Sequence, residues 1–231
     1  MPKPRRPSRL KPLKTLKIFC EGEKTEPGYL NGYIATLQND SRKTVIEVQK
    51  TKKNTAVQLV EEAIKAKKSP EAMEDDEFWV VCDREAKTKY SDGLHAKAFD
   101  MAEKAGIEIA LCNVCFEYWL LLHFIETDAP FYSFEDLVKR SSLNNEIVKL
   151  HGKDYDKSSP AIFNIVKDRI TEARARGFRL NSRGKSSAAQ GRDKPYHINP
   201  YVGVVELLDA IDAFTALVIA EDGLVVPCAA Q

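Results

Sequence analysis

Short apolar runs alternate with amphipathic stretches along the first half of the chain. Runs with the composition of buried strands lie at 16–20, 44–48, 78–82 and 107–111. Between them, apolar residues recur at helical spacing in 27–37, 55–69 and 93–105. This alternating order predicts a four-stranded, mostly parallel sheet with helices on both faces, because parallel strands need crossover helices.

The second half of the chain has a helical pattern. Residues 116–124 are apolar nearly all round, which is typical of a buried helix. Further helical patterns lie at 134–143, 161–176 and 202–218, and the Ser-, Gly-, Arg- and Lys-rich residues 181–197 are expected to form a mobile basic loop. The predicted organisation is an extended basic arm at 1–14, an α/β domain at 15–126 and a helical region at 127–231.

Composition excludes several classes of protein. No apolar run approaches the roughly 20 residues of a membrane span, and the basic amino-terminal residues precede only a short strand rather than an apolar signal core. The five cysteines are odd in number, and three lie in or at the end of predicted strands, which is typical of reduced, buried thiols. A cytoplasmic protein without a membrane partner is expected.

The net charge of +1 hides a strong segregation of charge. Residues 1–14 carry a charge of +6, residues 165–195 carry another +6, and the remainder is therefore acidic. Basic segments beside an acidic body suggest a polyanionic partner, although a basic tail can also be merely solvated. The candidate nucleic-acid contacts are Arg5, Arg6, Arg9, Lys24, Lys153, Lys157, Arg183 and Lys185.

Two carboxylates follow the third predicted strand, Phe-Trp-Val-Val-Cys at 78–82. Ligands and catalytic groups collect at the carboxyl ends of parallel strands, and Asp83 and Glu85 lie at that position. Two neighbouring carboxylates repel one another, and a divalent cation such as Mg²⁺ or Mn²⁺ relieves the repulsion. The alternative is a solvated loop pair or a salt bridge with Lys87 or Lys89.

Two other strands bring acidic groups to the same edge. Glu21 follows the first strand, and Glu117 lies in the segment 113–117 after the fourth. Each has a structural alternative, since acids are favoured near helix N-termini. Together with Asp83 and Glu85 they form the candidate catalytic set, and Glu21, Asp83 and Glu85 form the candidate metal ligands.

Two further polar groups have simpler explanations. Cys112 and Cys115 have the spacing of half a zinc or redox site, but no second pair completes one, which favours core thiols. His123 lies in an apolar helical segment and is expected to be a hydrogen-bonded core histidine rather than a ligand.

The sequence resembles the RloB family, which includes the AbiL-type component of abortive infection systems. The resemblance is carried by Phe-Cys-Glu-Gly-Glu-Lys-Thr-Glu-Pro-Gly-Tyr at 19–29, Val-Val-Cys-Asp-Arg-Glu at 80–85 and Asn-Val-Cys-Phe-Glu-Tyr-Trp-Leu-Leu-Leu-His-Phe at 113–124. It implies a Toprim-like fold, whose pattern is a Glu after the first strand and Asp-x-Asp after the third. Glu21 and Asp83 match that pattern, whereas Glu85 stands where Asp is usual.

The resemblance also implies a role in defence against phage, with an ATPase partner encoded alongside. With the acidic edge and the basic segments, it leads to the expectation of a Mg²⁺- or Mn²⁺-dependent nuclease. Two alternatives are a non-catalytic, Toprim-shaped module that docks on an ATPase or on nucleic acid, and nucleotidyl chemistry, for which no base pocket is apparent. DNA and RNA substrates are not distinguished.

Overall fold

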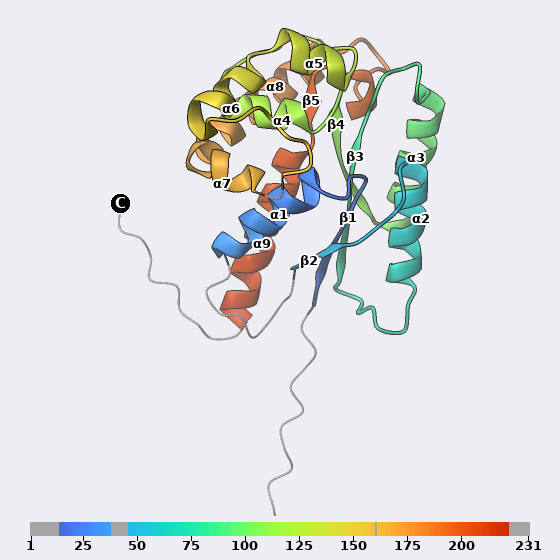
Figure 1. Ribbon diagram of the computed structural model, residues 1–231. Coiled ribbons are helices and arrows are strands. Elements are labelled where there is room, and N and C mark those ends of the chain that lie inside the picture. The colour runs from blue at the N-terminus through green and yellow to red at the C-terminus, as the bar shows by residue number, and fades with distance from the viewer. Residues whose placement is uncertain (1–13, 38–45, 160, 222–231) are drawn as a thin grey trace, which may run out of the picture.

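The protein is built around one five-stranded sheet. The computed structural model describes residues 14–37, 46–159 and 161–221, so most of the predicted arm lies outside it. The strand order is β2-β1-β3-β4-β5 (Figure 1). The strands are β1 (Leu16–Cys20), β2 (Ile46–Gln49), β3 (Glu77–Asp83), β4 (Glu108–Asn113) and β5 (Tyr201–Val202).

The four long strands are parallel, as predicted from the alternating pattern, and helices flank the sheet on both sides. The central strand β3 is buried from Phe78 onwards, because its apolar run is covered on both faces. β5 was not predicted. It is two residues long and pairs antiparallel with β4, Val202 opposite Cys112 and Tyr201 opposite Asn113, so its pattern is too short to read from sequence.

Two pairs of helices cover the sheet, one pair on each face (Figure 1). One pair is α2 (Ala56–Lys67) and α3 (Asp92–Ala105), and the other is α1 (Thr25–Leu37) and α9 (Val204–Glu221). The predicted end of α3 is confirmed, because Gly106, with a φ of 61°, ends the helix. The helix begins one residue earlier than predicted, after Ser91, whose side chain accepts a hydrogen bond from the Leu94 amide.

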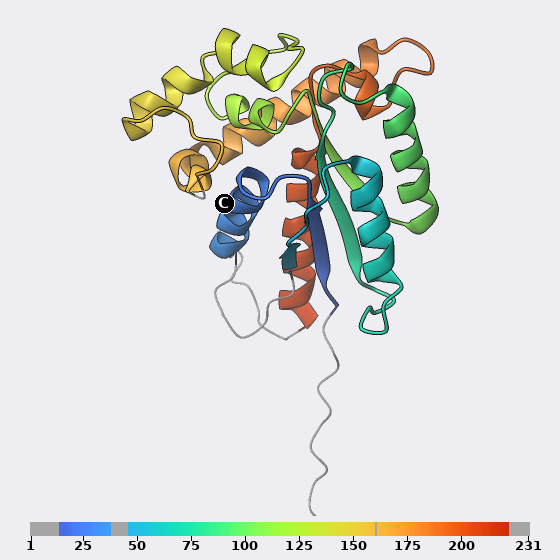
Figure 2. The ribbon, with the colours of Figure 1, turned by 45° about the vertical axis from the view of Figure 1, so that its right-hand side comes forward.

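Most of the remaining helices lie beyond the carboxyl ends of the parallel strands, and one of them, Ile162–Val166, packs beside α1 (Figure 2). They are α4 (Glu117–Leu122), α5 (Phe134–Arg140), α6 (Leu143–His151), α7 (Ile162–Val166), α8 (Ile170–Ser187) and the 3₁₀ turns η1 (Lys167–Arg169) and η2 (Pro195–His197). α4 is fully buried, as its apolar composition indicates. Because β5 and α9 return to the sheet, side chains from both halves of the chain share one core. None of the described helices is long and apolar enough to cross a membrane.

The expectation of a mobile loop at 181–197 is wrong for residues 181–187, which form the last turns of α8. Composition misleads here because Asn181 is buried. Its side-chain amide donates to the Val202 carbonyl at 3.1 Å, and its carbonyl accepts from the Val202 amide at 3.0 Å. Gly177 and Gly184 let the helix approach Val205 and Ile198 closely. The two small residues therefore serve packing rather than flexibility.

Gly203 is where the return of the chain to the sheet is tightest. A Cβ at this position would lie 2.6 Å from the Leu111 amide nitrogen and 2.9 Å from the Ala110 Cα, and these backbone atoms belong to β4. We expect Gly203→Ala to lower the free energy of unfolding by about 3 kcal/mol, because overpacking against backbone forces a shift. Chemical denaturation measures the change.

Gly93→Ala is the matched control. Gly93 lies in α3, and its added Cβ would meet only the Ser91 Oγ at 3.8 Å. That substitution should be neutral or slightly stabilising, because alanine favours the helix. Equal stability of the two variants would contradict the close approach at Gly203.

Candidate functional site

Glu21 and Asp83 meet at the carboxyl edge of the sheet. β1 and β3 are neighbours, with Cys20 opposite Val81, so the residue after β1 lies beside the end of β3. The Glu21 carboxylate accepts a hydrogen bond from the Asp83 amide at 3.1 Å. The Asp83 carboxylate in turn accepts one from the Phe116 amide, just before α4, at 2.8 Å. The predicted convergence of three strand ends is therefore present.

Three carboxylates lie deeper than Glu21, and we call Glu26, Asp83 and Glu117 the inner carboxylates. Glu26 is 3%, Asp83 6% and Glu117 0% exposed. The Oε2 atoms of Glu26 and Glu117 are buried without a hydrogen-bond partner. A buried, unpaired carboxylate oxygen is costly, so these oxygens are ready to accept a ligand.

The electrostatics of the site favour protonation of its acids. Burial raises the pKa of Glu21 to about 7, with Glu85 and Glu26 adding to the effect and the Asp83 amide opposing it. Burial also raises the pKa of Asp83 well above its ordinary value, and the charges of Glu26 and Glu117 raise it further. Burial also raises the pKa of Glu26, its own backbone amide opposes the rise, and the charge of Glu117 adds to it. The acids repel one another strongly when ionised.

Glu85 lies outside this group. Its carboxylate forms an ion pair with Lys89 at 2.7 Å, which is the salt bridge considered as the alternative in the sequence. Its backbone has a φ of 56°, and its amide donates to the Val114 carbonyl at 2.9 Å. Its charge helps to raise the pKa of Glu21, whereas the raised pKa of Asp83 is due to burial, Glu26, Glu117 and Glu21. Glu85 therefore borders the site at Glu21.

Arg84 sets the direction of the loop after β3. Although 1% exposed, its guanidinium reaches the Asp92 carboxylate at 2.6 Å, the Tyr90 carbonyl at 2.8 Å and the Tyr196 carbonyl at 3.1 Å. These bonds tie the strand end to α3 and η2. The middle residue of the Asp-Arg-Glu triplet thus holds the loop while Asp83 faces the other acids.

A segment from the helical region covers the inner carboxylates; we call residues 153–159 the covering segment. The Tyr155 hydroxyl donates to the Glu117 Oε1 at 2.8 Å, and the Lys157 Nζ lies 3.5 Å from the same atom. The Thr25 hydroxyl at the start of α1 donates to the Lys157 carbonyl. The site is therefore assembled from both halves of the chain.

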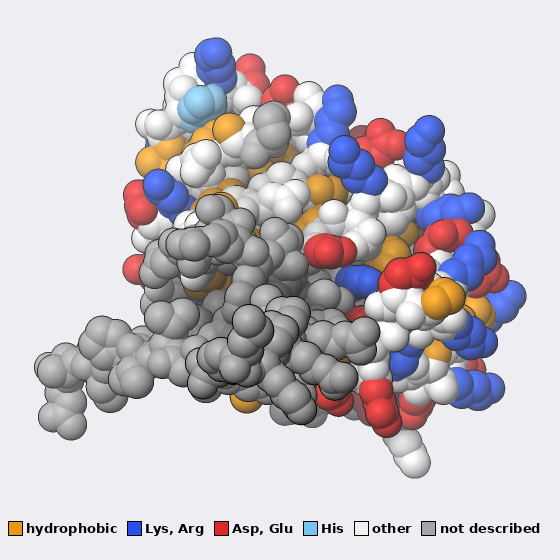
Figure 3. All heavy atoms as spheres, turned by 90° about the horizontal axis from the view of Figure 1, so that it is seen from below, with side chains coloured by type: hydrophobic (Ala, Val, Ile, Leu, Met, Phe, Trp, Pro, Cys, Tyr) orange, Lys and Arg blue, Asp and Glu red, His pale blue; other side chains and the backbone are white. Residues whose placement is uncertain are grey.

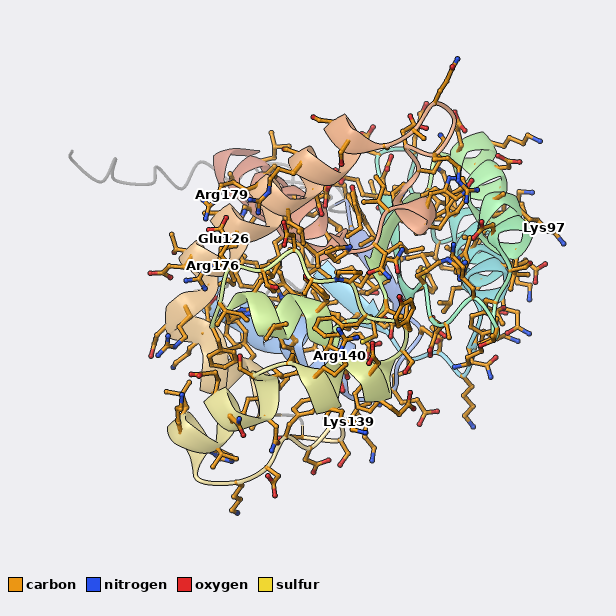
Figure 4. All side chains as sticks on the ribbon, turned by 90° about the horizontal axis from the view of Figure 1, so that it is seen from above. Lys97, Glu126, Lys139, Arg140, Arg176 and Arg179 are labelled. Carbon is orange, nitrogen blue, oxygen red and sulfur yellow. The ribbon has the colours of Figure 1, made fainter. Side chains whose placement is uncertain are left out.

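The predicted nucleic-acid contacts do not all gather around the site. Lys24 and Lys153 are exposed, and Lys157 faces Glu117. Arg183 pairs at 3.3 Å with Glu126, which also pairs with Arg179 (Figure 4), and Lys185 pairs with Glu206 at 3.8 Å. Arg5, Arg6 and Arg9 lie outside the described residues.

Glu26 was missed by reasoning from the sequence. It lies in an acidic run, Glu21-Gly-Glu-Lys-Thr-Glu26, and resembles an acid placed to stabilise the first turn of a helix. Gly22 is the residue in the sequence that could have indicated the inward position of Glu26. A Cβ on Gly22 would lie 2.0 Å from the Glu26 Oε2, so the side chain at 26 needs the glycine at 22 in order to turn inward.

Among the described residues, two cysteines and one histidine that the sequence singled out lie in the core. Cys112 and Cys115 are buried free thiols, and burial raises the pKa of both. His123 has partners at both ring nitrogens, the Tyr29 hydroxyl and the Trp119 carbonyl, each at 3.0 Å. Both observations agree with core roles.

The donor set fits a hard divalent cation. Carboxylate oxygens are the ligands that Mg²⁺ and Mn²⁺ prefer, and the free oxygens of Glu26 and Glu117 are buried beside Asp83. Within the described ranges, however, no three acidic, histidine or cysteine side chains converge closely enough to form a ready-made metal centre. A cation at this site would require the carboxylates to draw together.

Comparison with known proteins gives one family. The family model described as RloB-like protein matches residues 16–211, which include the sheet, the inner carboxylates and the covering segment. No curated protein and no solved structure matches the chain. Because the match spans most of the sequence, the chain belongs to the RloB-like protein family.

Proposed function

We propose that this protein is a nuclease that hydrolyses phosphodiester bonds with the help of Mg²⁺ or Mn²⁺. The observation that carries the proposal is the pair of buried, unpartnered oxygens on Glu26 and Glu117, beside Asp83 at the carboxyl edge of the sheet. Buried acids with raised pKa values, such as Glu26 and Asp83, gather at functional sites.

In this proposal the inner carboxylates hold the cation, and Glu21 borders them. A bound divalent cation supplies charge for the scissile phosphate and lowers the pKa of an attacking water. Glu21 would accept a proton from the attacking water, since its pKa of about 7 suits a general base at neutral pH. Lys24 and Lys89, both exposed, contact the neighbouring phosphates.

The substrate approaches from the carboxyl end of the sheet. In Figure 4 that end is seen from above, with Lys139 and Arg140 on α5 and Arg176 and Arg179 on α8 facing the viewer. In Figure 3 the opposite end carries acidic and basic side chains interspersed wherever described residues are visible. Arg140 is paired with Asp136 and Arg179 with Glu126, so Lys139 and Arg176 are the cations at this end that would attract a polyanion.

The direct test incubates the pure protein, with and without its neighbouring ATPase, with labelled DNA and RNA in Mg²⁺, Mn²⁺ or EDTA. Cleavage that requires the cation and disappears in Asp83→Asn supports the proposal. Cleavage in EDTA, or cleavage that survives the substitution, contradicts it. Comparing DNA with RNA also assigns the substrate class.

We further propose that the nuclease acts in defence against phage, together with an ATPase. This part rests on family membership, so its test is made in cells. Coexpression with the neighbouring ATPase should reduce plaque formation, and Glu21→Gln or Asp83→Asn should remove the protection without lowering protein levels. Full protection by both variants would favour the second candidate, a non-catalytic docking module, which the Glu85–Lys89 ion pair favours.

Lys24 and Lys89, the two exposed lysines beside Glu21 and Glu85, lead to a prediction about nucleic-acid binding. Replacing Lys24 and Lys89 by Gln should reduce the slope of log affinity against log salt by roughly 0.7–0.9 for each phosphate that the protein no longer neutralises. Filter binding in Ca²⁺ at several salt concentrations measures the slope. Lys97→Gln is the control, because Lys97 is exposed and projects from α3 at the right-hand edge of the molecule in Figure 4. An equal change in the control would show that only net charge matters.

A further inference from the structure

The positively charged end of Lys157 lies beside the buried inner carboxylates. Its Nζ is 3.5 Å from the Glu117 Oε1, and Glu117 is fully buried whereas the Lys157 side chain is 48% exposed. Burial lowers the pKa of Lys157, but the charges of Glu117, Asp83 and Glu26 outweigh burial and raise it. The ammonium therefore lies beside the Glu117 carboxylate on the solvent side, and the charges of all three inner carboxylates act on it.

The backbone of the covering segment is fixed, whereas the end of the lysine is not. The Thr25 hydroxyl holds the Lys157 carbonyl, and Tyr155 is held by the Glu117 carboxylate and by the Asn144 side chain, which accepts from the Tyr155 amide at 2.7 Å. Beyond Cβ, Lys157 contacts Glu117 at salt-bridge distance and passes over the Phe134 ring, with Nζ 4.5 Å from its centroid. Its half-exposed side chain can therefore swing outward without disturbing the core.

We propose that Lys157 is a built-in counter-ion of the inner carboxylates, and that an incoming divalent cation displaces its ammonium toward the solvent. This inference rests on the proposed function, because it assumes that the inner carboxylates bind a cation. Two positive charges compete for the same oxygens, so the cation binds only as tightly as its advantage over the lysine allows.

The ammonium of Lys157 therefore lowers the affinity of the site for a cation, and replacing Lys157 by an uncharged residue should raise that affinity. Lys157→Met keeps most of the aliphatic side chain but loses the charge, and we expect it to bind Mn²⁺ about tenfold more tightly than the wild type. In the absence of a cation the same variant should melt at a lower temperature, since the ionised acids lose their counter-charge. Added Mn²⁺ should restore the melting temperature. Isothermal titration calorimetry and thermal unfolding measure both effects on the full chain, without any substrate.

Two control variants separate position from net charge. Lys153→Met removes the same charge from the same segment, but Lys153 is exposed, so Mn²⁺ affinity should change less than twofold. Lys157→Arg keeps the charge and should stay near wild type. An additional Glu117→Gln substitution should recover the cation-free stability of Lys157→Met, because it removes the acid nearest the lysine.

The outcomes distinguish the two proposals. If the wild type binds Mn²⁺ and Lys157→Met binds it equally or more weakly, the counter-ion role is overturned while the cation site stands. If neither protein binds Mn²⁺ at millimolar concentration, both proposals fail. If Lys153→Met tightens binding as much as Lys157→Met, the effect is general electrostatics and the displacement is refuted.

Discussion

Asp83→Asn should abolish most of the proposed nuclease activity and yet yield a more stable protein. Activity should fall by at least about 10²-fold, the loss expected when one preorganised electrostatic group leaves a catalytic site. Asparagine keeps the oxygen that accepts the Phe116 amide, so the loop before α4 stays in place. It also removes a charge that repels Glu26 and Glu117, so the free energy of unfolding at pH 8 should rise without a cation.

Glu85→Gln is the informative comparison for that experiment. Glu85 follows Asp83 by two residues but pairs with Lys89, so its loss should lower activity by less than about tenfold, as expected of an exposed ion pair. Single-turnover cleavage rates and urea denaturation of both variants are the measurements. If Glu85→Gln were the more damaging substitution, the inner carboxylates would not be the cation site.

Glu21 should make the cation-free protein lose stability as the pH rises. The folded-state pKa of Glu21 is about 7, above the ordinary value of 4.5, so its stabilising contribution is complete below pH 4.5 and is lost as the pH rises through 7. A shift of that size corresponds to roughly 3 kcal/mol. Glu21→Gln should therefore match the wild type near pH 4.5 and exceed it by up to about 3 kcal/mol at pH 8.

The wild type must be compared with Glu21→Gln because the buried histidines also make stability depend on pH. They make the free energy of unfolding fall as the pH falls, the opposite of the effect of Glu21. Burial lowers the pKa of His95 and His123 to about 4, so their contribution is lost as the pH falls from 6.5. That contribution is the same in both proteins and cancels in the difference. Denaturant unfolding at half-unit pH steps in EDTA measures it. A difference that does not change with pH would show that Glu21 titrates normally.

Strong periodicity and strand-end chemistry could be read from the sequence, whereas contacts between distant segments could not. The run at 78–82 and the acids after it predicted a buried central strand with a polar end, because a run apolar on both faces suits only a covered strand. Glu26 escaped because an acid in the first turn of a helix is ordinary there. Its inward position depends on the space left by Gly22 and on the covering segment, about 130 residues away in sequence.

The C-terminal half shows the same limit. Residues 181–187 look like a loop by composition, and they are helical because Asn181 bonds to β5. β5 itself has only two residues, and its pairing is defined by β4 rather than by any pattern of its own. The division at residue 126 stays a prediction, and the shared core shows that any such division would cut through packed side chains.

The buried thiols offer a way to watch the site open. Cys20, Cys82, Cys112 and Cys115 line the strand ends around the carboxylates, and burial raises the pKa of each well above its ordinary value. Such thiols react with alkylating reagents only while the chain is open, so their labelling rates report local opening free energies. Cys115 lies close enough to Glu117 and Asp83 for their charges to raise its pKa. In a Cys228→Ser background, the alkylation rate of Cys115 would therefore measure how often this part of the site opens to water.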